Sequence, residues 1–538
     1  MSSRQDAAAQ TVPASHETSP LLANQNGPDA SSAHQGVIPS MAHKMHLFVP
    51  AVGLGIYLVA IDQLLTVAAY AKIGNELNAL NNMSWIATSY FLTLTSFQPL
   101  YGKLSDIFGR KECLLFAYAV FGIGCLGCGL AQSMVQLCVS RAFAGIGGGG
   151  MSAVVSILLS DMVPLRERGV WQGYINIIYA AGSSTGAPLG GILADSIGWR
   201  WSFLAQAPMC GVAWISVYYV LDVPSPTKSH WMTKMRQIDF VGALVLIVAV
   251  TALLLGLDCG SNLGWSHPIT IASVCTAPFL FALFVLIEVR VASHPFAPGH
   301  IIFDRGLFAC YLANFFSVAS TFGALFFLPL YLQAVEGKSA TTSGALLVPS
   351  MVASVIASVG SGWIIKKTGR FYAITLLSYA VQTTSISCMI ASLWVRFVGG
   401  EVASLAFMSG GAGAGLTITL IGLLANASTD DTAVVVACSY LFRSLGSSIG
   451  ISVSSAAMQQ VLRTQLASRL HNGDAARSVE KRVRQNIDFI RLLPRHIADI
   501  VRDSYQLATI GAFVPSLAFS LIALLVAFWI REKPLNRS

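Results

Sequence analysis

The stretch YGKLSDIFGRK, from Tyr101 to Lys111, places four charged side chains and two glycines between two long apolar runs. The runs cover residues 84–101 and 112–131. An α-helix rises about 1.5 Å per residue and needs about 20 mostly apolar residues to cross the hydrocarbon core of a membrane. We therefore expect this stretch to be a short charged loop between two transmembrane helices.

A similar stretch, GWIIKKTGR, begins at Gly362 and also follows an apolar run. Both stretches place a Gly-Arg pair seven residues after their first glycine. A second match occurs in the same order, since GSSTG at Gly182 returns as GSSIG at Gly446. Many transporters consist of repeated bundles that face each other across a central substrate site. Together the matches predict a duplicated six-helix unit.

The whole chain has the composition of a membrane protein. Its 538 residues are 54% hydrophobic and 11% charged, whereas an ordinary soluble domain is about 25% charged. The apolar runs predict an all-α membrane protein with about 14 transmembrane helices, grouped six, two and six. The predicted helices lie near residues 47–67, 84–101, 112–131, 136–160, 170–194 and 201–221, then 239–257 and 269–288, then 307–333, 344–365, 371–391, 399–424, 433–456 and 507–530.

Basic side chains gather in alternate loops, which sets the expected orientation. The chain has 33 Lys and Arg against 25 Asp and Glu, and cytosolic loops of membrane proteins carry such an excess. Orientation in a membrane therefore explains the charge better than a nucleic-acid surface does. The loops assigned to the cytosol hold Lys103, Arg110, Lys111, Arg166, Arg168, Lys228, Lys234, Arg236, Arg290, Arg305, Lys366, Lys367 and Arg370. Both termini are predicted to be cytosolic.

The predicted organisation has four parts. Residues 1–44 are polar and form a disordered cytosolic tail, residues 45–222 the N-terminal bundle, residues 223–300 a linker with two extra transmembrane helices, and residues 301–538 the C-terminal bundle. An Arg-rich loop at about 457–506 falls on the luminal or external side, because longer loops cross a membrane regardless of their charge. Its amphipathic sequence predicts helix.

The opening stretch resembles a loop of the major facilitator superfamily, Gly-x-x-x-Asp-x-x-Gly-Arg-Lys/Arg, which follows the second helix of that fold. The matching residues are Gly102, Asp106, Gly109, Arg110 and Lys111. The resemblance implies a conformational latch, in which Asp106 meets the positive N-terminus of a facing helix and Arg110 can pair with it. Lys103, in contrast, is expected only to mark the cytosolic side.

Two further signatures resemble the same family. Arg141 opens RAFAGIGGGG, which is similar to a fourth-helix motif whose arginine is linked to proton transfer. GSSTGAPLGG resembles the fifth-helix antiporter motif Gly-x-x-x-Gly-Pro-x-x-Gly-Gly, with Ala187 at the proline position and Pro188 one place later. Its motif residues are Gly182, Gly186, Pro188, Gly190 and Gly191. Small residues also serve ordinary helix packing, so the antiport assignment rests on the resemblance.

The chain as a whole is most similar to the fourteen-helix drug:proton antiporter branch, and within it to fungal vacuolar basic amino acid transporters. The segments that carry this likeness are NNMSWIATSYFLTLTSFQPLYGKLSDIFGRK, from Asn81, and RERGVWQGYINIIYAAGSSTGAPLGG, from Arg166. One departure concerns the first helix. Related proteins usually continue its aspartate with Gly-Thr, whereas this chain has Asp62-Gln63-Leu64.

Ionisable residues at membrane depth generally face a cavity and a partner. Asp62 is the predicted proton site, because a carboxylate there can load and release a proton as access alternates, and Arg141 is its predicted coupling partner. A fixed structural ion pair is the alternative. Glu401 occupies the repeat position of Arg141 and suits either a cationic substrate or an interfacial charge. Residues predicted to face the substrate cavity are Asp62, Gln63, Asn176, Tyr179, Asn314 and Glu401.

The sequence lacks the motifs of several other classes of protein. The sequence has no Gly-x-x-x-x-Gly-Lys-Ser/Thr loop for an ATP-driven pump, no His-x-x-x-His metal helix and no nucleophile motif with a base. Cys125 and Cys128 have metal-like spacing, but they lie in a predicted transmembrane helix without a second ligand pair. We expect no enzyme activity, no cofactor and no metal.

The expected function is proton-coupled antiport of small cationic metabolites, such as basic amino acids, from the cytosol into the vacuole. Plasma-membrane efflux of drugs or a toxin is the alternative within the same class, and a nutrient sensor on a transporter scaffold is the alternative from another class. The expected partners are a small-molecule substrate, protons and the lipid bilayer, with no nucleic acid.

The N-terminal tail contains Glu-x-x-x-Leu-Leu, formed by Glu17, Leu21 and Leu22. Sorting adaptor complexes bind this acidic dileucine pattern in flexible cytosolic tails of cargo bound for vacuoles and lysosomes. Short patterns of this kind also arise by chance in biased segments. Together with the resemblance to vacuolar transporters, the pattern predicts a multi-pass protein of the vacuolar membrane.

Overall fold

The structure is a computed structural model, which describes residues 45–162, 165–221, 240–290, 304–427, 432–469, 480 and 482–532. Within these ranges the chain is helical and contains no strand. The tail 1–44, with its leucine pair, lies outside the described residues.

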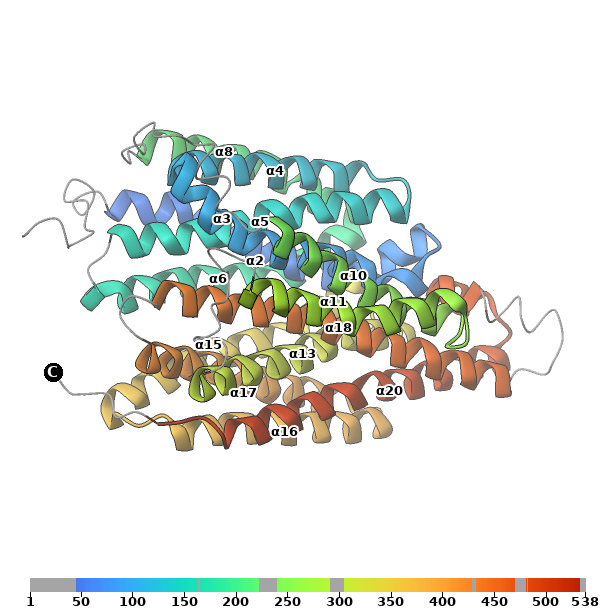
Figure 1. The fold of residues 1–538 in the computed structure, drawn as a ribbon. Coiled ribbons are helices and arrows are strands. Elements are labelled where there is room, and N and C mark those ends of the chain that lie inside the picture. The colour runs from blue at the N-terminus through green and yellow to red at the C-terminus, as the bar shows by residue number, and fades with distance from the viewer. Residues whose placement is uncertain are drawn as a thin grey trace, which may run out of the picture.

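The N-terminal bundle begins with α2, which starts at the end of the molecule where α20 (Arg495–Ala527) finishes (Figure 1). Its elements are α2 (Met45–Glu76), η1 (Leu80–Asn82), α3 (Ser84–Phe108), α4 (Arg110–Leu130), α5 (Met134–Met162), α6 (Leu165–Ser196), α7 (Arg200–Leu204) and α8 (Gln206–Val220). Gly109 joins α3 to α4 with φ of 103°, a conformation that favours glycine because it has no Cβ. The predicted span 201–221 consists of two helices, α7 and α8, which are separated at Ala205.

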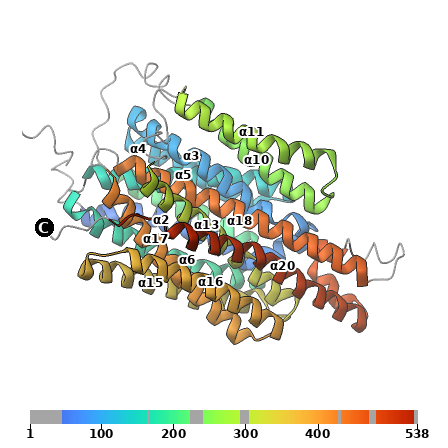
Figure 2. The same cartoon turned by 60° about the horizontal axis from the view of Figure 1, so that its bottom comes forward.

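Two linker helices lie along the outside of the molecule, beside α3 and α18 (Figure 2). They are α10 (Phe240–Asn262) and α11 (Pro268–Arg290), and α18 spans Thr432–Arg469. Leu246, Val250 and Leu254 of α10 form an apolar cluster with Leu441 of α18. The inserted pair thus contacts both bundles.

The C-terminal bundle repeats the plan of the first. Its elements are α13 (Arg305–Ala334), α14 (Ala340–Ala345), α15 (Val348–Thr368), α16 (Tyr372–Val395), α17 (Val398–Asn426), α18, η2 (Ile487–Leu492) and α20 (Arg495–Ala527). The predicted loop at 457–506 is largely helix, since α18 continues to Arg469 and α20 begins at Arg495. The extensions form because Leu466 and Val501 are buried in the core.

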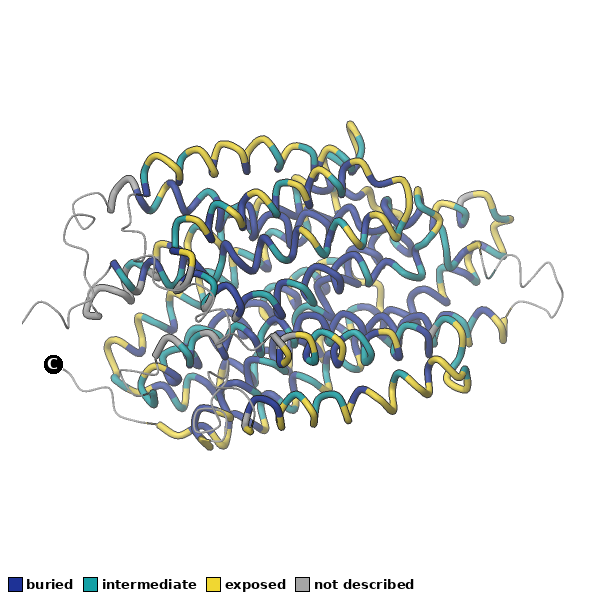
Figure 3. The backbone as a smooth tube through the Cα atoms, turned by 45° about the horizontal axis from the view of Figure 1, so that its top comes forward, coloured by how far each residue is buried: buried dark blue, intermediate teal, exposed yellow. Residues whose placement is uncertain are grey.

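Eleven described helices are long and apolar enough to cross a membrane. Every predicted span overlaps a helix, but α3, α6 and α10 are not among the eleven, so the number of 14 stays a prediction. Exposed positions run along the outer helices (Figure 3). They include Phe116, Ile215, Phe279, Leu377 and Trp394. Faces this apolar fit the hydrocarbon core of a bilayer.

Equivalent glycines hold the first helix of each bundle to the fifth. Gly182 and Gly186 of α6 lie against carbonyl oxygens of α2, and Gly446 and Gly450 of α18 lie against carbonyl oxygens of α13. The carbonyls belong to Tyr57, Ile61, Phe315 and Ala319. A Cβ added at Gly182 or Gly446 would lie 2.7 Å or 2.4 Å from the facing oxygen. The two halves therefore share their packing at the positions where the sequence repeats.

We predict that Gly450→Ala destabilises the protein by about 1–3 kcal/mol, because overpacking forces backbone shifts. The added Cβ would lie 2.2 Å from the carbonyl oxygen of Ala319. The measurement is the thermal unfolding midpoint of purified protein in detergent. The matched control is Gly360→Ala, where no atom lies within 4 Å of the new Cβ. Equal midpoints for the two variants would contradict the packing account.

Candidate functional site

Asp62 and Arg141 form a buried ion pair inside the N-terminal bundle. Arg141 Nη1 lies 2.6 Å from Asp62 Oδ2, and the side chains are 1% and 0% exposed, respectively. Asp62 lies midway along α2 and Arg141 in the second turn of α5. A buried charge is tolerated only when a partner offsets its desolvation, so each residue depends on the other.

The surroundings of the pair satisfy its remaining polar atoms. Arg141 Nε donates to the carbonyl oxygen of Ile86 on α3 at 3.2 Å, and the guanidinium lies 4.3 Å from the ring centroid of Tyr90. Gln206 Nε2, at the start of α8, donates to Asp62 Oδ1 at 3.3 Å. Both carboxylate oxygens therefore accept a bond, and α2, α3, α5 and α8 meet at one charged centre.

Sequence reasoning missed Gln206 and Tyr90. The signal for Gln206 was its amide in an otherwise apolar predicted helix, but its partner Asp62 is 144 residues away. Tyr90 carried no signal, because an aromatic residue in a transmembrane helix is ordinary. It is the close contact of its ring with Arg141 that makes it part of the site.

Glycines bring the helices close enough for these contacts. A Cβ at Gly145 of α5 would lie 2.2 Å from the carbonyl oxygen of Tyr90, and one at Gly149 would lie 2.8 Å from that of Leu94. The glycine-rich run after Arg141 thus lets α5 approach the backbone of α3. The same approach carries the Arg141 side chain to the Ile86 carbonyl.

The predicted cavity residues fall into separate groups. Tyr179 Oη donates to Gln63 Oε1 at 2.7 Å, so this pair lies beside Asp62. Asn314 lies inside the C-terminal bundle, where it donates to Ser439 and accepts from Thr419. Glu401 is buried near the start of α17. The side chain of Asn176 lies outside the described residues.

The latch residues contact their own bundle. Arg110 Nε lies 3.0 Å from Asp161 Oδ2 of α5, and Arg110 Nη1 donates to Ser105 Oγ at 2.5 Å. Lys111 Nζ donates to the carbonyl oxygen of Tyr218 on α8 at 2.7 Å. The side chain of Asp106 lies outside the described residues, so its pairing with Arg110 stays a prediction.

The glycine motif that resembles an antiporter signature faces both bundles. Gly190 continues the contact of Gly182 and Gly186 with α2, since a Cβ there would lie 2.1 Å from the carbonyl oxygen of Leu65. Gly191 faces α14 of the other bundle, where its Cβ would lie 2.5 Å from the carbonyl oxygen of Ala340. Pro188 lies inside α6, which runs through it without interruption. These small residues therefore form part of the seam between the bundles.

Polar bonds join the bundles at what we call the α2–α3 end, where η1 links those two helices. Asp195 Oδ2 at the end of α6 accepts from the Thr341 amide at 2.7 Å, and its other oxygen lies 2.5 Å from Lys72 Nζ. Gln333 Nε2 of α13 donates to the carbonyl oxygen of Ala68 on α2 at 3.3 Å. The bundles are closed against each other at this end.

The segment before α20 reinforces the closure. We call residues 482–493 the clamp segment. Asn75 at the end of α2 accepts from the Ile487 amide at 2.8 Å and donates to Asp488 Oδ2 at 2.9 Å. Asn486 Nδ2 donates to the Asn75 carbonyl at 3.3 Å. The first bundle is thereby tied to a segment of the second.

The linker helix α10 contributes to the closure at the α2–α3 end through Asn262. Its Oδ1 accepts from Arg484 of the clamp segment at 3.0 Å, and its Nδ2 donates to Asn82 Oδ1 at 3.0 Å. Arg484 Nε also donates to Gln459 Oε1 of α18 at 3.3 Å. Asn262 therefore connects the linker pair, the first bundle and the clamp segment.

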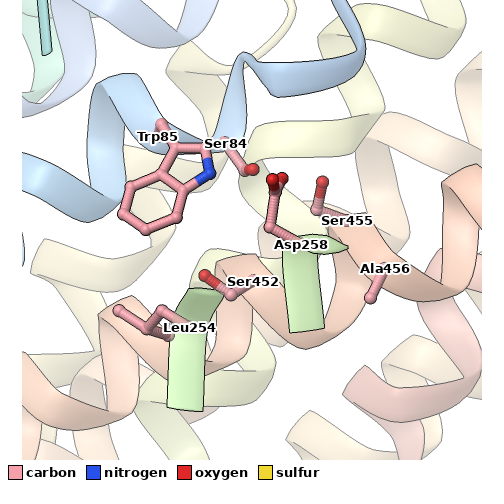
Figure 4. Close-up of a pocket in the computed structure, with 7 residues that line it drawn as sticks. All are labelled: Ser84, Trp85, Leu254, Asp258, Ser452, Ser455 and Ala456. Carbon is pink, nitrogen blue, oxygen red and sulfur yellow. The ribbon is translucent and has the colours of Figure 1, made fainter. Parts of the chain in front are cut away.

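A small polar cavity of about 10 Å³ lies nearby, where α3, α10 and α18 meet. The Trp85 indole nitrogen, the Ser84 hydroxyl and the Asp258 carboxylate point toward one another beside it, with Ser455 close by (Figure 4). A cavity of this size holds about one water molecule. It belongs to the closure and is far too small for a metabolite.

The family follows from a comparison with known proteins. The sequence model described as Major Facilitator Superfamily matches residues 52–451. The chain belongs to the major facilitator superfamily. The predicted all-α membrane protein with this fold is thereby confirmed, and the protein is a transporter and not an enzyme, as expected from its sequence.

Relatives within the family are similar over most of their length. "Vacuolar membrane amino acid uptake transporter fnx2" of Schizosaccharomyces pombe is 38% identical over 457 residues, covering 85% of this chain and 79% of that protein. "Multidrug resistance protein fnx1" of the same organism is 34% identical, covering 89% and 90%. "Vacuolar basic amino acid transporter 1" of Saccharomyces cerevisiae is 28% identical, covering 97% and 99%.

A solved structure shares the fold. The bacterial homologue of the human lysosomal transporter Spinster, in an inward-facing and unoccupied conformation, gives a TM-score of 0.62 at 13% identity. The superposition covers 92% of this chain and 99% of that one. The superfamily fold therefore extends over nearly the whole described chain.

We predict that Arg141→Met destabilises the protein by roughly 3–5 kcal/mol, because it leaves the Asp62 carboxylate buried without its partner. The measurement is the thermal unfolding midpoint in detergent. Asp62→Asn in the same chain should restore much of the loss, because it removes the unpaired charge. Arg502→Met is the control, since Arg502 and its partner Asp499 are largely exposed. A double variant no more stable than Arg141→Met would contradict the ion-pair account.

Proposed function

We propose that this transporter is a proton-coupled antiporter that moves basic amino acids from the cytosol into the vacuole. The observation that carries the proposal is the fully buried Asp62–Arg141 pair, with the carboxylate held at both oxygens. The names of two relatives, a vacuolar amino acid uptake transporter and a vacuolar basic amino acid transporter, support the substrate class and the membrane.

Protonation of Asp62 provides the coupling. The ionised carboxylate accepts bonds from Arg141 and Gln206, and so holds α5 and α8 against α2. A proton on Asp62 removes the charge that binds the guanidinium, which leaves Arg141 as an uncompensated cation. The helices then favour an arrangement in which Arg141 reaches another acceptor or water. Proton binding therefore shifts the balance between conformations.

Competition at the same carboxylate turns coupling into exchange. A cationic substrate is attracted to ionised Asp62 and repelled by Arg141 once Asp62 is neutral. The polar pair of Gln63 and Tyr179, next to Asp62 on the α2 and α6 faces, supplies hydrogen-bonding groups for such a substrate. Substrate and proton thus occupy the site in alternation, as antiport requires.

Drug efflux driven by protons is the second candidate function. The observation that favours it is the relative named "Multidrug resistance protein fnx1", which is 34% identical and aligned over 90% of its own length. The charged pair serves a cationic drug as well as a basic amino acid, because it binds the proton and attracts positive charge without recognising the rest of the substrate.

Asp62→Asn should abolish pH-driven uptake of labelled lysine, arginine or histidine into vesicles acidified by a proton pump. The amide keeps the shape of the side chain but binds no proton in exchange for substrate. The matched control is Asp499→Asn, an exposed carboxylate on α20 that should leave uptake unchanged. Full gradient-driven uptake by Asp62→Asn would show that Asp62 is not the proton-coupling residue. Failure of the wild-type protein to take up all three amino acids would overturn the substrate class.

We attribute the location in the vacuolar membrane to the acidic dileucine pattern of the N-terminal tail. Adaptor complexes bind such a pattern from the cytosol, where both termini lie. We predict that Leu21→Ala combined with Leu22→Ala redirects a fluorescently tagged protein from the vacuole to the cell surface. Uptake by reconstituted protein should not change, because these residues precede α2. An unchanged vacuolar location would refute the sorting signal and leave antiport untouched.

A further inference from the structure

Glu401 is a buried carboxyl group that the proposed coupling pair does not use. It lies in the first turn of α17 and is 0% exposed. Neither of its carboxyl oxygens has a hydrogen-bond partner in the described part of the chain. The hydroxyl of Tyr331 on α13 lies beside it and acts on it as a neutral hydrogen-bonding group, but the two groups do not reach the geometry of a formed hydrogen bond, and Tyr331 Oη has no other partner among the described residues.

The charges around Glu401 do not neutralise it. Glu336, which follows α13, acts on it as a second negative group. Arg396 lies between α16 and α17, but Asp503 and Gln506 of α20 hold its guanidinium. α16 carries no charged residue, and the basic residues of α15 lie in its last turn, at the opposite end from Glu401. α18 contributes Arg443, Arg463 and Arg469, with no ion pair to Glu401 among the described residues.

The internal repeat allows Glu401 to be compared with the buried charge of Arg141 in the first bundle. Arg141 and Glu401 both lie early in the fourth helix of their bundle, but not at the same repeat position as predicted: Arg141 is in the second turn of α5, whereas Glu401 is one turn nearer to the start of α17. The charge of Arg141 is offset by Asp62 at 2.6 Å. The matching contacts of Gly186 with Ile61 and of Gly450 with Ala319 make Ser320 the position on α13 that corresponds to Asp62, so the C-terminal bundle has no equivalent charged partner. The duplicated fold therefore holds a paired charge in one half and a solitary acid in the other.

A solitary buried carboxylate is costly, because several kcal/mol of desolvation are repaid by no partner. The same group with a proton bound is neutral, and its O–H becomes a donor beside the Tyr331 hydroxyl. We propose that Glu401 is a second proton-binding group of the transport cycle, in the C-terminal bundle and separate from the Asp62–Arg141 pair. This inference rests on the proposed proton-coupled function.

The position of Glu401 gives its route to water. It lies close to the start of α17, toward the α2–α3 end where polar bonds now close the bundles. When that end opens, water reaches the carboxyl group, and a hydrated proton forms the O–H bond. For transport, the O–H bond has to break while the opposite end is open, so that the proton passes to water on that side and the carboxylate is regenerated. One proton moves in each cycle in addition to the proton on Asp62.

The proton count of the full-length protein tests the proposal. Wild type and Glu401→Gln are reconstituted in vesicles with the membrane potential clamped at zero, and labelled lysine is the probe. With a gradient of about one pH unit, losing one coupled proton lowers the limiting accumulation by about tenfold, the factor that corresponds to 1.4 kcal/mol. Glu401→Gln should still exchange labelled for unlabelled lysine without a gradient. Asp499→Asn, which removes an exposed carboxylate on α20, is the control and should accumulate lysine as wild type does.

Two results would overturn the proposal. One is equal accumulation by Glu401→Gln and wild type. The other is loss of both exchange and accumulation by a variant with the wild-type unfolding midpoint, which would make Glu401 a substrate-binding residue. Failure of wild type to accumulate lysine at all would instead count against the proposed function.

Infrared difference spectroscopy between acidic and alkaline pH tests the protonation without any substrate. Wild type should show a carboxylic acid C=O band that disappears at alkaline pH, and Glu401→Gln should lack this band. Glu401→Asp should shift the band, which assigns it if Glu401→Gln does not fold. A band of unchanged size and position in all folded variants would refute proton binding at Glu401 whatever the protein transports.

Discussion

One ion pair organises the N-terminal bundle, because a charge at membrane depth has to be paired where it lies. Arg141 and Asp62 pair at 2.6 Å, and this contact requires α5 and α2 to lie close to each other and to α3. The glycine run after Arg141 permits that approach, since any larger residue at Gly145 would strike the α3 backbone. The amide of Gln206 then places α8. The positions of four helices thus follow from satisfying two buried charges.

The two halves share packing but not charge. Glycines of α6 and α18 touch the backbones of α2 and α13 at matching positions, so both bundles have the same close pair of helices. The charged centre occurs in the first bundle, whereas the second has Glu401 and the amide network of Asn314. The two bundles thus share the glycine contacts that set the spacing of their helices, whereas their buried polar groups differ.

Much of this arrangement could be predicted from sequence. The apolar runs locate the helices, since membrane helices satisfy their backbone within the segment and leave a continuous apolar signature. The charged loop at 101–111 and the glycine motifs could be found because each lies within a few residues. Asp62 and Arg141 stood out because charge is rare at membrane depth.

The remaining features depend on contacts between distant parts of the chain. Gln206 is an ordinary amide until α8 packs against α2. The bond between Asn75 and Asp488 joins residues 413 apart, and neither belongs to a local pattern. The interruption at Ala205 divides the single span that hydropathy predicts. The helical ends of α18 and α20 agree with the helix predicted from the amphipathic sequence of residues 457–506, but the burial of Leu466 and Val501 in the core depends on tertiary packing.

The clamp segment shows how a transporter can seal one end and still release it. Its contacts with Asn75 and Asn262 are hydrogen bonds. Each contributes about 0.5–1.5 kcal/mol between neutral groups and about 1.5–3 kcal/mol where Arg484 or Asp488 takes part, because water replaces the partner when the bond breaks. Val483, Ile487 and Ile490 of the same segment are buried in the apolar core, so opening this end also exposes apolar surface to water. The hydrogen bonds define the closed geometry, and the apolar side chains add to its stability. Because Asn262 belongs to the linker pair, α10 and α11 share in this reversible seal and are more than a spacer between the bundles.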